Sequence, residues 1–190
     1  EGADWLTQKH FGKQLIDRDV EILDPATGTG TFICELLEHF RGQPEKLAWK
    51  YKNELHANEV AILPYYVANL NIESTYAAIS GQFAEYPNLC FVDTLDNVAG
   101  LGIKAGQQMD MLAGLSDENI ERVKRQNRKK ISVVIGNPPY VQLQKNRGAL
   151  AKLYKNVGYK TFASTGDIYA LFYEKGNQMG AHRGVLRLSH

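Results

Sequence analysis

Short apolar runs alternate along the chain with longer segments in which apolar side chains recur at helical spacing. The short runs predict strands at residues 20–23, 54–57, 89–92, 131–135 and 185–188. Helical spacing predicts helices over residues 31–40, 62–72 and 116–128. This alternation is typical of βαβ units, and it predicts an α/β fold built around a parallel sheet.

Two of the predicted helices follow the first and second strands. The helix at residues 31–40 carries large apolar side chains on one face, namely Phe32, Leu36, Leu37 and Phe40. Gly42 and Pro44 are expected to end it. The next helix carries apolar side chains at Ile62, Leu63, Tyr66, Leu70 and Ile72. Pro64 falls in its first turns, where proline is tolerated, so it does not argue against this helix.

The order of charges along residues 116–128 also favours a helix. Acidic Asp117 and Glu118 stand near its start and basic residues gather toward its end, which complements the helix dipole. The following run at residues 131–135 is rich in β-branched side chains and is expected to form a central strand buried on both faces. That strand would deliver Asn137 to the carboxyl edge of the sheet.

Residues 94–116 define no element clearly, because glycines, polar residues and scattered hydrophobic residues follow no period. Together with the helix after them, they are predicted to form an insertion at residues 94–130, between the third and fourth strands. The chain as a whole has the size of one domain. With 190 residues and 44% hydrophobic content, it is long enough to bury a single core.

Charge and apolar content exclude several classes of protein. Twenty-two basic residues against 21 acidic ones leave a net charge of +1, without the basic excess of a stand-alone nucleic-acid-binding protein. No apolar run approaches the roughly 18–20 residues of a membrane span, and no signal-peptide pattern opens the chain, so a cytoplasmic protein is expected. Cys34 and Cys90 lie in apolar segments, which favours small core residues over a disulfide or a metal site.

A glycine-rich turn follows the first strand, in the sequence LDPATGTGTF at residues 23–32. Gly28 and Gly30 have no Cβ, so the backbone can approach a ligand closely and adopt positive φ. A phosphate-binding P-loop would place a lysine after Gly30, where Thr31 stands. A dinucleotide fingerprint would need a third glycine where Ile33 stands. The turn therefore favours a nucleoside cofactor without a pyrophosphate, and S-adenosylmethionine fits that description.

A second motif, Asn137-Pro138-Pro139-Tyr140, directly follows the predicted central strand. The prolines fix the backbone and donate no N–H, so nearby carbonyl groups stay free as acceptors. Asn137 adds a side-chain carbonyl, and Tyr140 adds a ring that can stack on a planar substrate. Two acceptors taking the hydrogens of an exocyclic amine would direct its lone pair toward a methyl donor, so the motif predicts methylation of such an amine.

With both motifs in this order, the sequence resembles the N6-adenine DNA methyltransferases, including type I modification subunits and fused type IIG restriction–modification enzymes. The resemblance implies a Rossmann-like, doubly wound, mostly parallel sheet of the class I S-adenosylmethionine-dependent methyltransferases. It assigns the methionine part of the cofactor to Asp24, Pro25, Ala26, Thr27, Gly28 and Gly30. It also assigns the cofactor ribose to Glu59 and the cofactor adenine to Asp93. The target adenine would be held by Asn137, Pro138 and Tyr140.

The resemblance continues through residues 141–176, where D-I-Y-A-L-F-Y at residues 167–173 marks a helix that packs near the cofactor in the type IIG subgroup. Here Asp167 is expected to cap that helix, and Tyr169, Phe172 and Tyr173 are expected to be core residues. The family usually continues with further strands and a target-recognition domain. Residues 1–190 are therefore expected to be a catalytic core that is incomplete at its C-terminus, lacks the last strands of the sheet and has no target-recognition domain.

Basic residues suggest where DNA would pass. The run at residues 121–130 is the densest positive cluster, and it fits a solvated helix face as well as it fits a DNA contact. Lys145 and Arg147 lie just past Tyr140, where the phosphates beside a flipped adenine would run, so they are the predicted DNA contacts.

The predicted function is transfer of a methyl group from S-adenosylmethionine to N6 of a flipped adenine in double-stranded DNA, within a restriction–modification system. A specificity subunit or a fused recognition domain would be its partner. Two alternatives stay open: methylation of a protein glutamine or an RNA base, and a non-catalytic remnant that keeps the cofactor site. The insertion at residues 94–130 and the downstream resemblance favour DNA over the other acceptors.

Overall fold

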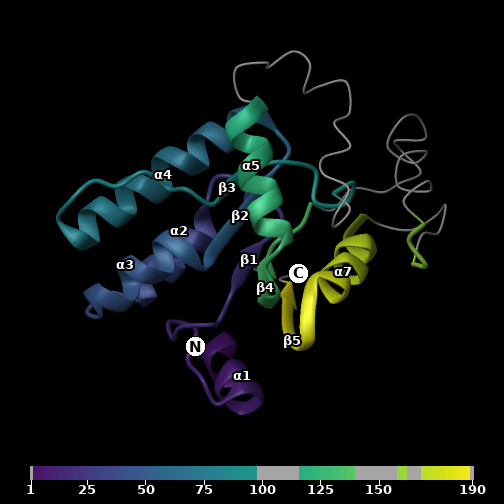
Figure 1. The fold of residues 1–190 in the computed structure, drawn as a ribbon, viewed down its shortest axis with the longest axis horizontal. Coiled ribbons are helices and arrows are strands. Elements are labelled where there is room, and N and C mark those ends of the chain that lie inside the picture. Colours follow the sequence, from purple (N-terminus) through teal and green to yellow (C-terminus); the bar gives the residue numbers. More distant parts are fainter. Residues whose placement is uncertain (1, 98–115, 140–157, 162–167, 189–190) are drawn as a thin grey trace.

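The computed structural model describes residues 2–97, 116–139, 158–161 and 168–188 (Figure 1). Its strands are β1 (Ile22–Asp24), β2 (Leu55–Glu59), β3 (Leu89–Phe91), β4 (Ile131–Gly136) and β5 (Gly180–Leu188). Its helices are α1 (Gly2–Phe11), α2 (Thr31–His39), α3 (Pro44–Asn53), α4 (Ile62–Ser80), α5 (Ser116–Asn127) and α7 (Ile168–Met179). Among these, no helix is long and apolar enough to cross a membrane.

The strands form one sheet in the order β3-β2-β1-β4-β5, and every neighbouring pair is parallel. This confirms the predicted parallel α/β architecture. Strand order reverses at β1, which has β2 on one side and β4 on the other. The first strand ends at Asp24, one residue beyond the prediction, and the fifth begins at Gly180, five residues before it.

Helices cover both faces of the sheet, with α2, α3 and α4 on one side and α5 and α7 on the other (Figure 1). Alternate strand residues serve the two cores: Ile22 and Val133 pack with the first group of helices, whereas Leu23 and Val134 pack with α7. The prediction that residues 131–135 form a strand buried on both faces is therefore confirmed. Cys90 is buried against α5, Cys34 is half-buried, and both thiols are free.

Helix α2 occupies the predicted residues, but Ile33 is fully buried where Phe32 was expected and Phe32 is only half-buried. Helix α3 was not predicted. Pro44 does not merely follow α2: it occupies the first turn of a new helix, where its missing N–H is not needed. Helix α3 buries Leu47, Lys50 and Tyr51.

Helix α4 packs against the sheet through Tyr65, Ala68, Ile72 and Tyr76. Three of the apolar residues that the sequence pattern placed on this helix point away from the core instead, because they fall on its opposite face. Leu63 is 75% exposed, Tyr66 49% and Leu70 64%. The helix ends at Ser80 and is capped by Gly81, whose φ of 75° favours a residue without Cβ.

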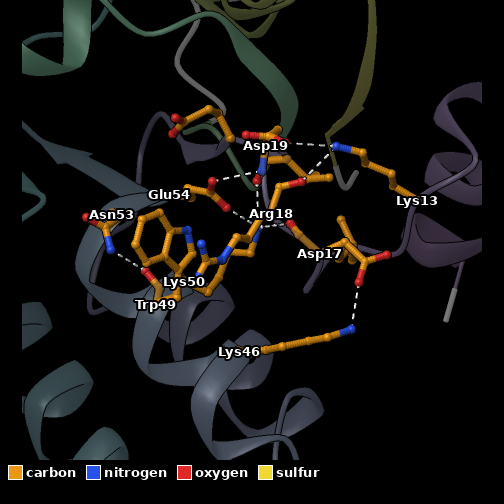
Figure 2. Close-up of polar contacts among 12 residues, drawn as sticks. Lys13, Asp17, Arg18, Asp19, Lys46, Trp49, Lys50, Asn53 and Glu54 are labelled. Carbon is orange, nitrogen blue, oxygen red and sulfur yellow. Dashed lines mark hydrogen bonds and ion pairs between the residues drawn. The ribbon is translucent and has the colours of Figure 1, made fainter.

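A buried lysine joins α3 to the chain that leads into β1 (Figure 2). Lys50 Nζ is 2.6 Å from the Asp17 carbonyl oxygen, 2.9 Å from that of Val20 and 2.7 Å from Glu54 Oε2, and it donates to all three. Lys46, one turn earlier on α3, lies at the surface and pairs with Asp17 at 2.7 Å. These contacts fix the chain just before β1, and with it the position of the turn that follows.

Candidate functional site

The carboxyl ends of β1, β2, β3 and β4 meet at one edge of the sheet, where the strand order reverses. Ligands of open α/β sheets bind at such a reversal. The segments that follow these strands, together with α7, form a pocket of about 230 Å³. It is lined by Pro25, Ala26, Gly28, Glu59, Val60, Val92, Asp93, Thr94, Asn137, Pro139 and Phe172. The structure thus brings the glycine-rich turn, both predicted acidic residues and part of the proline motif to one place.

The two glycines of the turn adopt left-handed conformations, with φ of 57° at Gly28 and 88° at Gly30. A Cβ added at Gly30 would lie 3.1 Å from Ile72 Cγ1 and 3.3 Å from the Ala68 backbone, so Gly30 lets α2 pack closely on α4. A Cβ added at Gly28 would have nothing within 4 Å. Gly28 therefore supplies the turn conformation and leaves space on the pocket side, whereas Gly30 also serves helix packing.

Glu59 binds the backbone of the turn and of the next helix. Its Oε2 accepts a hydrogen bond from the Gly28 N–H at 2.8 Å, and its Oε1 accepts from the N–H groups of Val60 at 2.9 Å and Ala61 at 2.7 Å. The neighbouring Asn58 carbonyl accepts from the Thr27 N–H at 2.9 Å. The end of β2 therefore holds the turn in place as well as lining the pocket.

Asp24, at the end of β1, is fully buried. Its Oδ1 accepts from the Ala26 N–H at 3.2 Å, and its Oδ2 has no hydrogen-bond partner among the described residues. Burial, reinforced by the negative charge of Glu59, raises the pKa of Asp24 to about 7. A Cβ at Gly136 would lie 2.6 Å from Asp24 Oδ1, so β4 can run beside this carboxyl group only because it ends in glycine.

Asp93 follows β3 and is half-buried, with its Oδ1 accepting from the Leu95 N–H at 2.9 Å. Helix α7 covers this part of the pocket. Phe172 lines the pocket from α7, and Lys175, one turn further along, donates to the Asn97 carbonyl. Burial lowers the pKa of Lys175, although the charges of Asp93 and Asp96 oppose the shift.

The proline motif contributes two exposed residues to the pocket, Asn137 and Pro139, while Pro138 is buried. These residues begin directly after β4, on the opposite side of β1 from Glu59 and Asp93. Tyr140, Lys145, Arg147 and Asp167, all singled out in the sequence, lie outside the described residues. The pocket therefore joins an acidic, glycine-rich half to an amide- and proline-bearing half.

Residues 36–188, from within α2 to the end of β5, match the family described as Eco57I restriction-modification methylase. The chain belongs to this family. The resemblance to restriction–modification methyltransferases, drawn from the two motifs, is therefore confirmed. No curated protein matches the chain significantly.

Three solved structures are similar to this methylase-family chain over 97% of its length. A cryo-EM structure of a DrdV–DNA complex is 39% identical with a TM-score of 0.79. A nuclease-deletion mutant of the Type ISP restriction-modification enzyme LlaGI with a DNA substrate mimic is 31% identical with a TM-score of 0.79. The ATP-dependent Type ISP enzyme LlaBIII bound to DNA is 30% identical with a TM-score of 0.76.

The chain covers 18%, 16% and 13% of those three proteins, respectively. It therefore spans less than a fifth of each of them. Within that span, the similarity and the sheet topology together confirm the predicted Rossmann-like methyltransferase fold.

Two arginines of α5 in this methylase-family domain hold the helix against β3 and the residues just before it. Arg122 contacts Glu118 at 2.5 Å and the Leu89 carbonyl oxygen at 3.4 Å, and Arg125 donates to the Pro87 carbonyl at 2.6 Å. Arg122 is also mostly covered, since its side chain is 18% exposed. Arg122 and Arg125, two of the three arginines in the cluster at residues 121–130, therefore have a structural role.

Sequence reasoning missed Phe172 as a pocket residue. Tyr169 and Phe172 are buried, which confirms their prediction as core residues, and Tyr173 is half-buried. Phe172, however, also forms part of the pocket wall. The signal that could have identified it was the D-I-Y-A-L-F-Y segment, which the family resemblance already places near the cofactor.

Proposed function

We propose that this chain is the catalytic core of an S-adenosylmethionine-dependent enzyme that methylates N6 of a flipped adenine in double-stranded DNA, in a restriction–modification system. One observation carries the proposal: the pocket joins the glycine turn to Asn137 and Pro139 at the reversal of strand order. Membership of the restriction-modification methylase family supports DNA as the substrate. The DNA in the DrdV, LlaGI and LlaBIII structures supports it further.

The residues present fit the proposed cofactor. Asp24 is fully buried and does not line the pocket, but its carboxyl group directly precedes the lining residues Pro25 and Ala26, where its negative charge would favour a cationic ligand. Glu59 and Asp93 offer carboxylate oxygens for hydroxyl and amino groups, and Phe172 offers an apolar wall for an aromatic base. When bound, S-adenosylmethionine would supply an electrophilic methyl group. The chain would bind and orient it through the turn at residues 24–30.

In the proposed mechanism the proline motif binds the target amine. Asn137 is exposed beside the pocket, and its side-chain carbonyl and the backbone carbonyl of Pro138 would accept the two hydrogens of N6. Tyr140 would stack on the flipped base. Fixing the amine in this geometry directs its lone pair into the pocket, so positioning supplies much of the rate enhancement without a strong general base. Lys145 and Arg147 are the proposed phosphate contacts.

We also propose that catalysis and recognition of the DNA sequence are carried out by different domains or subunits. Residues 1–190 form the catalytic core, residues 94–130 are an insertion between the third strand and β4, and the DNA sequence is read by a separate recognition domain or specificity subunit. The near balance of charge, +1 overall, supports the assignment of most DNA affinity to such a partner.

Methyl transfer with labelled S-adenosylmethionine tests this function. The chain is supplied in parallel with double-stranded DNA, RNA and a glutamine-containing peptide, and labelled DNA is digested to nucleosides to locate the methyl group. We expect N6-methyladenine, and we expect Asn137→Ala to slow transfer at least 100-fold because the amine loses an acceptor. Asn53→Ala, at a half-buried position at the end of α3 that does not line the pocket, is the control. Transfer to RNA or peptide in preference to DNA, or a methyl group on DNA at a position other than adenine N6, would overturn the proposal.

A further inference from the structure

Three polar side chains are buried together between β2, the segment after β3, and α5. Asn58 is 0% exposed, Thr94 2% and Gln126 3%. Polar groups of this kind lower stability when they are buried unless they form hydrogen bonds. The three residues come from parts of the chain as much as 68 positions apart. Their hydrogen bonds therefore join segments of the chain that are distant in sequence.

Their hydrogen bonds run in one direction toward the glycine-rich turn. Gln126 Nε2 donates to Asn58 Oδ1 at 2.9 Å, and Asn58 Nδ2 donates to Thr94 Oγ1 at 3.0 Å. The Thr94 hydroxyl then donates to the Pro25 carbonyl at 2.6 Å. Both Thr94 and Pro25 line the pocket. This chain of hydrogen bonds from Gln126 through Asn58 and Thr94 to Pro25, called the relay below, therefore begins on α5 and ends at the pocket wall.

The relay ends at one of three bonds that hold the turn from the side of β2 and β3. The Thr94 hydroxyl donates to the Pro25 carbonyl. The Thr27 N–H donates to the Asn58 carbonyl, and the Gly28 N–H donates to the Glu59 carboxylate. Asn58 therefore supports the turn through both its main chain and its side chain. Without the Thr94 hydroxyl, the Pro25 carbonyl and the Asn58 amide would each lose a buried partner.

We propose that Asn58, Thr94 and Gln126 are positioning residues that keep the turn at residues 25–28 in its ligand-binding geometry, and that they link α5 to the pocket. None of them needs to touch the methyl donor or the target base for this role. The pocket's identity as a cofactor site rests on the proposed function, whereas the link from α5 to the turn rests on the hydrogen bonds alone. Threonine or serine suits position 94 because a hydroxyl can accept from Asn58 and donate to Pro25 at once.

Matched threonine variants test the relay. Thr94→Val keeps the shape of the side chain and removes its hydroxyl group, whereas Thr94→Ser keeps the hydroxyl group. Thr7→Val is the control, because Thr7 is also fully buried and its hydroxyl also binds backbone carbonyls, but within α1. The first measurement is amide hydrogen exchange without any cofactor. The reporters are the N–H groups of Ala26, Thr27 and Gly28, which bind Asp24, Asn58 and Glu59, respectively.

Thr94→Val should speed exchange at the three reporter amides about tenfold, the scale of one lost buried hydrogen bond, while Thr94→Ser and Thr7→Val leave it near the wild-type rate. Thr94→Val should also weaken binding of S-adenosylmethionine about tenfold. Should Thr94→Val fail to fold, Gln126→Met breaks the relay away from the pocket and should act in the same direction. Unchanged exchange in Thr94→Val, or equal exchange in the valine and serine variants, would overturn the positioning role.

The two measurements separate the relay from the proposed function. Faster exchange in Thr94→Val, in a protein that does not bind S-adenosylmethionine at all, would support the relay and reject the proposed cofactor. Binding of S-adenosylmethionine that is equal in wild type and Thr94→Val, with unchanged exchange, would support the cofactor and reject the relay.

Discussion

Burial controls the ionisation of Asp24, at the start of the glycine-rich turn. The pKa of its carboxyl group is raised from the ordinary 3.8 to about 7 by removal from water. The folded protein therefore holds this proton more tightly than the unfolded chain does. As the pH rises between these two pKa values, the free energy of unfolding falls. Above pH 7 the contribution of Asp24 to that free energy stays at its lower value.

Asp24→Asn should remove this pH dependence, since the amide has the same shape and cannot ionise. Relative to the variant, the wild-type protein should lose about 2.5 kcal/mol of unfolding free energy between pH 5 and pH 8. Urea denaturation of both proteins at the two pH values measures the difference, and the other titrating groups cancel in the comparison. Parallel pH profiles would show that Asp24 is already ionised in the folded protein at pH 5.

Gly136 lets β4 lie beside the Asp24 carboxyl group. In Gly136→Ala the new Cβ would lie 2.6 Å from Asp24 Oδ1 and 3.2 Å from Pro25 Cδ, so strand or turn must move. We expect a loss of about 2–4 kcal/mol in unfolding free energy, together with weaker ligand binding. Gly12→Ala is the comparison: its φ of 66° is strained, but its Cβ meets nothing within 4 Å, so only about 1 kcal/mol should be lost. Equal losses would contradict the close approach at Gly136.

At the scale of elements, α3 is held by its buried lysine. The Lys50 ammonium group satisfies two carbonyls and the Glu54 carboxylate, and burial lowers its pKa (Figure 2). Lys50→Met should reduce the unfolding free energy by about 3–5 kcal/mol, because it leaves the Glu54 charge buried without its partner. Lys46→Met, one turn away with a side chain 49% exposed, should change it by less than about 1 kcal/mol. Thermal denaturation of both variants checks this, and similar losses would contradict it.

The pattern of apolar residues predicted the parallel sheet because each buried strand is a short local signal. It did not predict α3, whose inner face includes a lysine, and it could not tell the buried face of α4 from the exposed one. Leu63 and Leu70 are as apolar as Ile72, and only packing against the sheet distinguishes them. The same holds for the site: the glycine turn and the proline motif are local sequences, whereas the relay from Gln126 to Pro25 exists only after distant segments meet.

At the scale of the whole molecule, the parallel sheet makes the two motifs a single site. More than 100 residues separate Asp24 from Asn137 in the sequence, yet β1 and β4 are neighbours and their carboxyl ends lie together. Segments after β2 and β3 add Glu59 and Asp93, and α7 adds Phe172. This arrangement is the one we propose to be a pocket selective for S-adenosylmethionine.

Calorimetric titration of the chain with S-adenosylmethionine, NAD and ATP tests that claim most directly. We expect S-adenosylmethionine alone to bind, and we expect Asp93→Ala to weaken it at least tenfold, as loss of a charged hydrogen-bond acceptor should. Asp117→Ala, at an exposed position on α5, should bind as the wild type does. Equal binding of NAD or ATP, or affinity for S-adenosylmethionine that Asp93→Ala leaves unchanged, would contradict the assignment of this pocket.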